Sequence, residues 1–333
     1  MSIALVKRGY DVTIFSMQDD ITYNYSGTLY NFGLDKRKYG KVKAFLRLKN
    51  FFKKNNFDFI IDHRLRNKYL KEVVFSKFIF NNFRVIYCVH NYRLQYYFSF
   101  IKIPWLATFP HANRRVFVAV SYDIKEYLKN RLNISSKTIY NFYSPDEVSI
   151  NKNKLLNSSY ILGLGRLTTI KQFDKLIRSY KNSDLYGSGI KLIIQGDGPE
   201  SDNLENLIRS LKLDNYVKLL PFKKHPYTLI KNAKALILTS KIEGFPMVII
   251  EALHLSTPVV AFNCKSGPSE IIKTGVNGIL VEDQNEEKLS IALNKLLDDN
   301  FYNEIKKNVS IDLDKFSEAT IIQKWEALFK NNM

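Results

Sequence analysis

Two glutamates eight positions apart are the first candidates for chemistry in this chain of 333 residues. Glu243 follows an apolar, strand-like run. Glu251 lies inside a predicted helix opened by Gly244, Phe245 and Pro246, since proline is favoured at the first helical position. Eight residues at helical rise span about 12 Å. Paired glycosidase carboxyls lie roughly 5–9.5 Å apart, so the spacing disfavours a hydrolase pair.

The helix start between the two glutamates offers a second chemistry. Its first N–H groups have no partner inside the helix, and the helix dipole is positive there, which favours a phosphate group. Two carboxylates flanking such a site could hold separate hydroxyl groups of one long ligand. The alternative is one exposed loop glutamate and one solvated helical glutamate, and the spacing by itself favours that alternative.

Arg166 and Lys171 are two cations five positions apart in a loop. The loop follows a strand-like run that ends at Gly165, and glycine lets a backbone approach a ligand closely. Arginine can hold phosphate oxygens in a bidentate grip, and lysine adds a point charge. The pair could neutralise a departing diphosphate without a metal. In isolation, a turn with surface cations is the simpler explanation.

The histidines and cysteines give a weaker signal. His90 ends the predicted strand 84–89, where a doubly wound sheet places ligand-binding residues, whereas His63 is less well placed. A lone histidine is more often structural. Cys88 and Cys264 lie in separate strand-like runs, with neither zinc-ligand spacing nor a disulfide framework, which fits a reducing cytoplasm.

The elements that must position these residues alternate in type. In the second half, apolar strands interleave with amphipathic helices, which predicts a parallel sheet with helices on both faces and a ligand at the carboxyl ends of the strands. The first half alternates less regularly. We therefore expect an α/β fold of two halves joined near residues 145–158, with mostly helix after about residue 286. The expected strands are 11–15, 57–61, 84–89, 116–120, 160–165, 191–195, 216–220, 235–239, 258–262 and 278–281, and the expected helices are 122–131, 169–181, 201–211 and 246–255.

The net charge of +18 is uneven, because residues 1–150 hold 25 basic and 11 acidic side chains, a net +14. Such a surface favours an anionic partner, whether nucleic acid, lipid or phosphorylated glycan, or is simply solvated. No nucleic-acid-binding motif accompanies it, so nucleic acid is not expected. The longest apolar run, 98–109, is too short to span a membrane, and no secretory signal is recognisable. We expect a cytoplasmic protein whose basic first half can contact the anionic inner face of the plasma membrane.

Taken in order, six segments resemble the retaining nucleotide-sugar glycosyltransferases of family 4. The resemblance runs from about Arg114 to the end of the chain and is strongest between Tyr160 and Asp283. It implies the GT-B fold, in which two Rossmann-like parallel-sheet domains face a cleft. The segments are Gly165-Arg-Leu followed by Lys171, Gln195-Gly-Asp-Gly-Pro199, Glu243-Gly-Phe-Pro followed by Glu251, Thr257-Pro-Val-Val-Ala261, Gly267-Pro-Ser-Glu270 and Gly275-Val-Asn-Gly278.

The resemblance implies roles for the candidate residues. Arg166 and Lys171 would hold the donor diphosphate, close to Gly165, and stabilise it as it leaves. Glu243 would contact the donor sugar, and Glu251 would bind the ribose hydroxyls. The other implied site residues are those that open the helix near the phosphates, Gly244, Phe245 and Pro246, and a cleft histidine near the transferred sugar, His90.

By the same resemblance, residues 1–150 form the acceptor-side domain, residues 151–315 bind the nucleotide sugar, and residues 316–333 form a helix that crosses back to the first domain. Relatives usually begin with a strand and a Gly-rich loop that approaches the donor. Here residues 4–15 already resemble the end of the first helix and the second strand, so that first strand and loop are expected to be missing. Ser256 replaces a usual glycine, with little expected effect.

The expected activity is transfer of a hexose or N-acetylhexosamine from a nucleotide sugar, UDP-linked, with retention and without a metal or other cofactor. The expected acceptor is a surface glycan: lipopolysaccharide or lipooligosaccharide, capsule, or a lipid-linked oligosaccharide. An inactive remnant or partner subunit of a glycosyltransferase and a sugar-nucleotide epimerase are the alternatives. A phosphorylase would need a lysine that anchors pyridoxal phosphate, and no lysine is singled out for that role.

Overall fold

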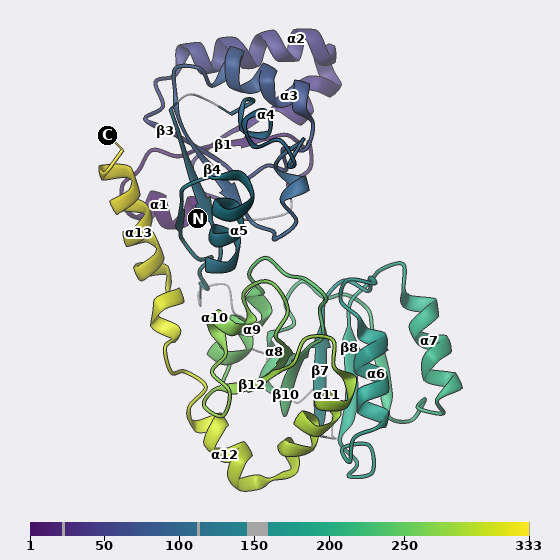
Figure 1. Cartoon of the computed structure of the whole chain (residues 1–333). Helices are drawn as coiled ribbons and strands as arrows, with labels where there is room; N and C mark the ends of the chain where they lie inside the picture. Colours follow the sequence, from purple (N-terminus) through teal and green to yellow (C-terminus); the bar gives the residue numbers. More distant parts are fainter. Residues whose placement is uncertain (22–23, 112–113, 145–158, 333) are drawn as a thin grey trace.

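The computed structural model describes residues 1–21, 24–111, 114–144 and 159–332, which form two lobes (Figure 1). Each lobe is built on parallel strands, so the predicted α/β class with two parallel sheets is confirmed. The join predicted near residues 145–158, and with it the domain boundary at residue 150, lies outside the described residues.

The first lobe contains α1 (Ser2–Lys7), β1 (Thr13–Ser16), β2 (Thr28–Asn31), α2 (Phe32–Lys54), β3 (Phe59–Asp62), α3 (Tyr69–Val74), η1 (Phe75–Ile79), β4 (Arg84–Val89), η2 (Leu94–Tyr96), α4 (Pro104–Thr108), β5 (Arg115–Ala119), α5 (Tyr122–Leu132) and β6 (Ser136–Thr138). Its main sheet has the parallel order β3-β4-β5-β6, and β1 and β2 form a separate parallel pair. β4 is buried from its second residue to its last, as its unbroken apolar sequence predicts for a strand covered on both faces.

The second lobe contains β7 (Tyr160–Leu164), α6 (Phe173–Lys181), β8 (Lys191–Gln195), α7 (Ser201–Ser210), β9 (Val217–Leu220), α8 (Tyr227–Lys231), β10 (Ala235–Leu238), α9 (Met247–His254), β11 (Val259–Phe262), α10 (Pro268–Ile271), β12 (Gly278–Val281), α11 (Glu286–Asn294), η4 (Lys295–Leu297), α12 (Asp299–Lys307) and η5 (Leu313–Phe316). The six parallel strands have the order β12-β11-β10-β7-β8-β9. The chain thus moves outward from β7 to β9 and then resumes at β10 on the other side of β7. A crevice forms at the carboxyl ends of strands where the order reverses in this way.

The last helix, α13 (Glu318–Lys330), returns to the first lobe, as predicted (Figure 1). It buries Ile321, Trp325 and Phe329 in a cluster shared with α1 and with strands β4 and β5. The Phe329 ring stacks on Phe59 of β3 at 5.1 Å between centroids. This apolar packing fixes the end of the chain against the first lobe.

The two described segments that lead from one lobe to the other run side by side. The Tyr143 N–H, near the end of the first lobe, donates to the Phe316 carbonyl, just before α13, at 3.3 Å. Tyr143 also forms a parallel β-bridge with Ser317. The path out of the first lobe and the path back into it are therefore hydrogen-bonded to each other.

Some elements differ from the sequence-based expectation. The helix predicted over 169–181 begins only at Phe173. Gln172 adopts a left-handed φ of 50°, and an α-helix cannot continue through a residue in that conformation. α2, β2 and β6 were not predicted. α2 mixes lysines with aromatics, and Gly40 with φ of 76° interrupts it, so its apolar period is not continuous. Among the described residues, no helix combines the length and the apolar character needed to span a membrane.

Candidate functional site

A cavity of about 700 Å³ opens at the carboxyl ends of β7 and β10, where the strand order reverses. β7 leads directly into Gly165, and the loop after β10 carries Glu243. Strand order therefore brings together segments that lie more than 70 positions apart in the sequence. The predicted residues that line this cavity are Gly165, Arg166, Lys171, Glu243, Phe245, Pro246 and Glu251.

Lys171 and Glu243 form an ion pair at this cavity. The lysine Nζ donates to Glu243 Oε1 at 2.6 Å, and the two side chains are only 23% and 14% exposed. Gly165 has a φ of 149°, and a Cβ there would lie 3.2 Å from Lys171 Cε, so glycine leaves room for the lysine side chain. The Thr239 hydroxyl, just after β10, donates to the Lys171 carbonyl at 2.9 Å. The lysine is thus held at the cavity by a carboxylate that a ligand's phosphate could replace.

The loop between Glu243 and α9 sets the start of that helix at the cavity. Pro246 had been predicted as the first helical residue. In the structure it is the N-cap, with φ of −74° and ψ of 94°, and the helix begins one position later, at Met247. No side chain caps the first turn, so its N–H groups can meet an anion. Phe245 anchors the loop by packing against the rings of Tyr140 and Phe316, at 4.9 and 5.4 Å. The predicted helix start at a ligand-sized cavity is therefore present.

Further polar groups line the same space. Arg166 is exposed, and Glu251 is half-buried within α9. Gln195, which ends β8, is 4% exposed, and its side-chain oxygen has no hydrogen-bond partner within the described part of the chain. A buried, unpartnered acceptor at a cavity is a position where a ligand donor group would be satisfied.

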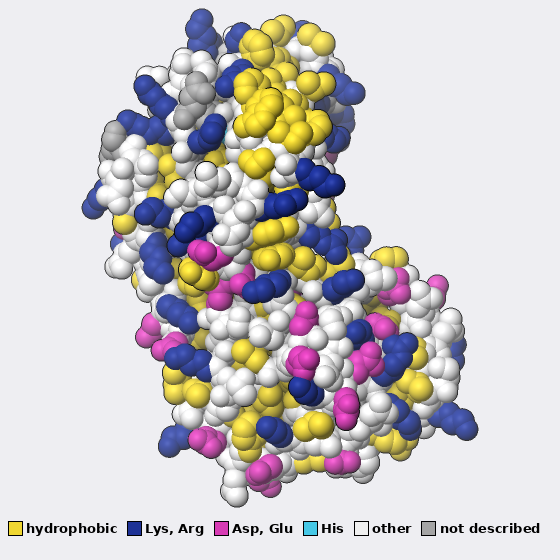
Figure 2. Space-filling view, viewed as in Figure 1, with side chains coloured by type: hydrophobic (Ala, Val, Ile, Leu, Met, Phe, Trp, Pro, Cys, Tyr) yellow, Lys and Arg dark blue, Asp and Glu magenta, His cyan; other side chains and the backbone are white. Residues whose placement is uncertain are grey.

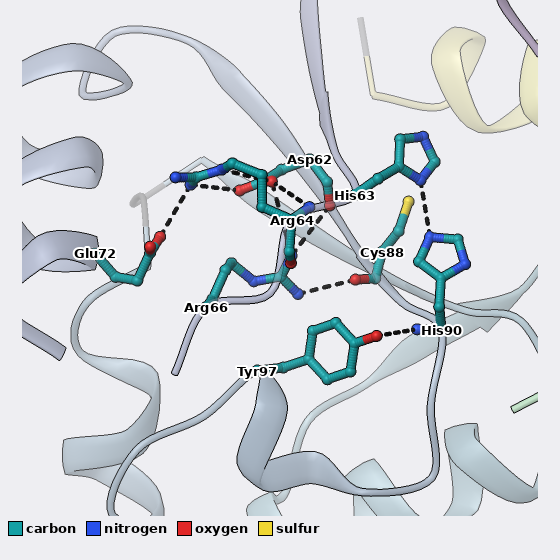
Figure 3. A network of polar contacts seen from close by, with 8 residues as sticks. All are labelled: Asp62, His63, Arg64, Arg66, Glu72, Cys88, His90 and Tyr97. Atoms are coloured by element: carbon teal, nitrogen blue, oxygen red, sulfur yellow. Dashed lines mark hydrogen bonds and ion pairs between the residues drawn. The ribbon is translucent and has the colours of Figure 1, made fainter. Parts of the chain in front are cut away.

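His90 lies in a smaller cavity of about 260 Å³ on the first lobe, not in the larger one. Its Nε2 lies 2.8 Å from Nδ1 of His63, so the two rings share a hydrogen bond (Figure 3). Burial lowers the pKa of His90 to about 3, so its imidazole is neutral at pH 7. With Cys88, the ring nitrogens form a group of donor atoms within 4.8 Å of one another, a set that a zinc-like ion could use. The bond between the rings already occupies one nitrogen of each.

A buried ionic network fixes the strand ends that carry these histidines (Figure 3). Arg64 binds Asp62 through two parallel hydrogen bonds, Nε to Oδ1 at 2.9 Å and Nη2 to Oδ2 at 2.8 Å, and the same Nη2 also donates to Glu72 at 2.9 Å. Arg66 donates to the Asp62 carbonyl at 3.1 Å and to the Cys88 carbonyl at 2.9 Å. No sequence pattern indicated this network, because its members are charges scattered around a predicted strand.

Family models match both parts of the chain. The model described as Glycosyltransferase Family 4 matches residues 1–147, and the model described as Glycosyl transferases group 1 matches residues 146–311. The chain belongs to glycosyltransferase family 4. The family predicted from six ordered sequence motifs is thereby confirmed.

Curated relatives of this glycosyltransferase include two bacterial enzymes named for glycan synthesis. It is 27% identical to the amylovoran biosynthesis glycosyltransferase AmsD of Erwinia amylovora, over 89% of this chain and 84% of AmsD. It is 28% identical to the lipopolysaccharide 1,6-galactosyltransferase of Escherichia coli, over 61% of this chain and 57% of that enzyme. The crystal structure of Anabaena HepE with UDP superposes with a TM-score of 0.74 at 21% identity, covering 92% of this chain and 86% of HepE. The GT-B fold is therefore shared.

One wall of the glycosyltransferase's cavity was missed from the sequence. It consists of Phe222, Lys223 and Lys224, with Pro226 and Tyr227 at the start of α8. These residues follow β9. Because the carboxyl ends of parallel strands share one edge of a sheet, a lysine pair just after a predicted strand could have indicated that this segment reaches the cavity. The Asp197 carboxylate accepts from the Phe222 N–H at 3.2 Å, so the turn after β8 positions this wall.

Gly244 marks the contact between the glycosyltransferase's two lobes, and a side chain there should be destabilising. A Cβ at Gly244 would lie 1.8 Å from the His90 carbonyl oxygen, a backbone atom that cannot turn aside. We expect Gly244→Ala to lower the free energy of unfolding by about 1–3 kcal/mol, as overpacking does. Urea denaturation measures the loss. Gly187→Ala is the matched control, because its Cβ would meet its nearest atom at 3.7 Å; equal stability of the two variants would contradict the contact.

Proposed function

We propose that this glycosyltransferase transfers a sugar from a UDP-linked donor, with retention at the anomeric carbon, to a bacterial surface-glycan acceptor. The observation that carries the proposal is the convergence of Lys171, Glu243 and the start of α9 on one cavity at the switch point of the sheet. The HepE structure with bound UDP and the polysaccharide roles in the names of AmsD and the galactosyltransferase support the donor and acceptor classes.

Each end of the donor has a suitable partner at the cavity. Arg166 and Lys171 would bind the diphosphate, together with the N–H groups of the first turn of α9. Glu251, one turn further along that helix, would accept hydrogen bonds from the ribose hydroxyls. A phosphate that takes over Lys171 releases Glu243, whose carboxylate can then accept from a hydroxyl of the sugar. His90 lines the separate cavity of the first lobe, so it would contact the transferred sugar only if that sugar extends from the larger cavity toward this lobe.

The chemical contribution of these residues is mainly electrostatic. In the reaction, the acceptor oxygen forms a bond to the anomeric carbon, the bond from that carbon to the diphosphate oxygen breaks, and the acceptor proton is released. The diphosphate leaves with the bonding electron pair, so negative charge grows on its oxygens in the transition state. Arg166 and Lys171 neutralise that charge where it develops, which is the interaction that accelerates such a step. No metal is needed in this scheme, because the two cations supply the positive charge.

Calorimetry with UDP and a donor assay together test the proposal. Purified protein should bind UDP, and incubation with UDP-glucose, UDP-galactose or UDP-N-acetylglucosamine should release UDP from one of them, faster when acceptor glycan is present and equally well with EDTA. Failure to bind UDP would favour an inactive remnant. Conversion of the donor to an epimer, without release of UDP, would favour an epimerase.

Glu251 should contribute to donor affinity more than to the rate of transfer. Loss of a hydrogen bond to a charged group costs about 1.5–3 kcal/mol, so we expect Glu251→Ala to raise the Kd for UDP roughly 10- to 100-fold. Calorimetry measures this change directly. Glu205→Ala, on the exposed side of α7, is the control and should leave the Kd unchanged. An unchanged Kd in Glu251→Ala would place the ribose elsewhere.

A further inference from the structure

One stretch of the first lobe contains basic residues and no acidic ones in its sequence. Residues 73–122 contain six Lys or Arg and no Asp or Glu, in a chain where 25% of residues are charged. Figure 2 shows a broad hydrophobic area on this lobe bordered by Lys and Arg side chains. A protein surface that is both apolar and basic is complementary to a partner with an apolar interior and an anionic surface, as in a bilayer of anionic lipids.

The exposed apolar side chains form two neighbouring segments. In the continuous helical run of α3 and η1, Leu70, Val74 and Phe78 recur every fourth position and so share one face. Leu70 is 78% exposed and Phe78 is 59% exposed. The second segment, in and around α4, exposes Phe100, Ile103, Trp105 and Phe109, with Trp105 71% exposed. We call these seven residues the apolar patch.

Two ring contacts join the segments into one surface. Tyr69 in α3 packs edge-on against Phe100 at 5.2 Å between centroids. The Lys77 Nζ in η1 lies 5.3 Å from the centroid of Phe109. On the inner side, both segments are anchored by buried residues of the core: Phe75, Ile79, Leu94, Tyr97, Phe98 and Ala107. The patch is therefore an ordered face of the lobe.

We propose that the apolar patch docks on an anionic phospholipid bilayer. Its aromatic and aliphatic side chains would enter the boundary between headgroups and acyl chains, where tryptophan is favoured. Lys77 and Lys102 lie within the same segments and would meet lipid phosphates, since basic side chains are attracted to an anionic membrane surface. Membrane binding itself needs neither donor nor acceptor. Only its consequence, access to a lipid-linked acceptor, rests on the proposed function.

Vesicle binding tests this surface. The protein is sedimented with vesicles of phosphatidylcholine and phosphatidylglycerol at 3:1, and with vesicles of phosphatidylcholine alone. We expect at least tenfold tighter binding to the anionic vesicles. We also expect a blue shift of tryptophan fluorescence, because Trp105 is exposed whereas Trp325, the other tryptophan, is only 5% exposed.

A double variant, Phe78→Asp with Trp105→Asp, should lose at least tenfold in affinity for the anionic vesicles. Ile291→Asp, at a residue of the second lobe that is 55% exposed, should retain it. UDP calorimetry on all variants shows that the fold and the donor site are intact, so a failure here is separate from a failure of the proposed reaction. The proposal is overturned if the double variant binds vesicles like the control or if wild type does not bind anionic vesicles. It is also overturned if wild type self-associates and the double variant loses that self-association but not vesicle binding, because the patch would then contact a second copy of the chain.

Discussion

Lys171→Ala should lower kcat for sugar transfer by roughly 10²–10³-fold, the range seen when one preorganised donor to a developing anion is removed. The expectation follows from position. Lys171 reaches the cavity beside Gly165, and its present partner is the Glu243 carboxylate at 2.6 Å, so its charge is fixed where the donor diphosphate would lie. Steady-state assays of UDP release measure the effect.

Lys175→Ala is the control for this experiment. Lys175 lies in α6, four positions after Lys171, but its ammonium group donates to the Gln284 carbonyl, and it does not line the cavity. We expect the control to keep nearly full activity. If Lys171→Ala raises KM while kcat stays unchanged, the lysine contributes binding that is equal in the ground and transition states, and its role at the leaving group is wrong.

Asp62→Asn should lower the free energy of unfolding by about 3–5 kcal/mol, because it removes the negative partner from a buried ionic network. Asp62 is 4% exposed and receives two hydrogen bonds from the Arg64 side chain, with Arg66 close by at 3.9 Å. Without the carboxylate, two guanidinium groups remain buried with less compensation. Asp174→Asn is the control, since its ion pair with Arg178 is exposed and worth about 0.5 kcal/mol at most.

The same network predicts a pH dependence. Burial by itself raises the pKa of Asp62, but Arg64 and Arg66 outweigh it and lower the pKa to about 2. Because the unfolded chain has an aspartate pKa of about 3.9, the carboxylate stabilises the folded state above that pH, and the stabilisation is lost as pH falls toward 2. The difference in stability between wild type and Asp62→Asn should therefore be full at pH 6 and shrink below pH 4. A constant difference would contradict the assignment.

The second lobe could be predicted from sequence because its signals are local. Each strand there is a short apolar run that ends in glycine or a polar turn, and Glu243 and Glu251 are fixed relative to each other by one loop and one helix. The contact between Lys171 and Glu243 could not be predicted in this way. It depends on β10 lying beside β7, and strand order is set by packing across the whole sheet.

The first lobe was less predictable for physical reasons. Its longest helix, α2, contains a break at Gly40, so no uninterrupted apolar period marks it. The proximity of His63, Cys88 and His90 arises because β3 and β4 are neighbours in register, with Ile61 opposite Ile86. No spacing along the chain records that register. The aromatic segment 92–109 divides between buried residues such as Tyr97 and exposed ones such as Trp105.

The hydrogen bond between Tyr143 and Phe316 has a mechanical consequence. Tyr143, near the end of the described part of the first lobe, lies beside Phe316 and Ser317, so the chain leaves and re-enters this lobe at neighbouring points, which can serve as one pivot. Two widely separated connections would resist rotation, whereas neighbouring ones allow the lobes to rotate about one axis once the contacts between them, such as those of Glu270 with the Tyr122 and Asp123 N–H groups, are broken. We expect the lobes to open and close by rotation about this pivot. Residues far from the pivot would then move the most, and those beside it, such as Phe245 on Phe316, would move the least.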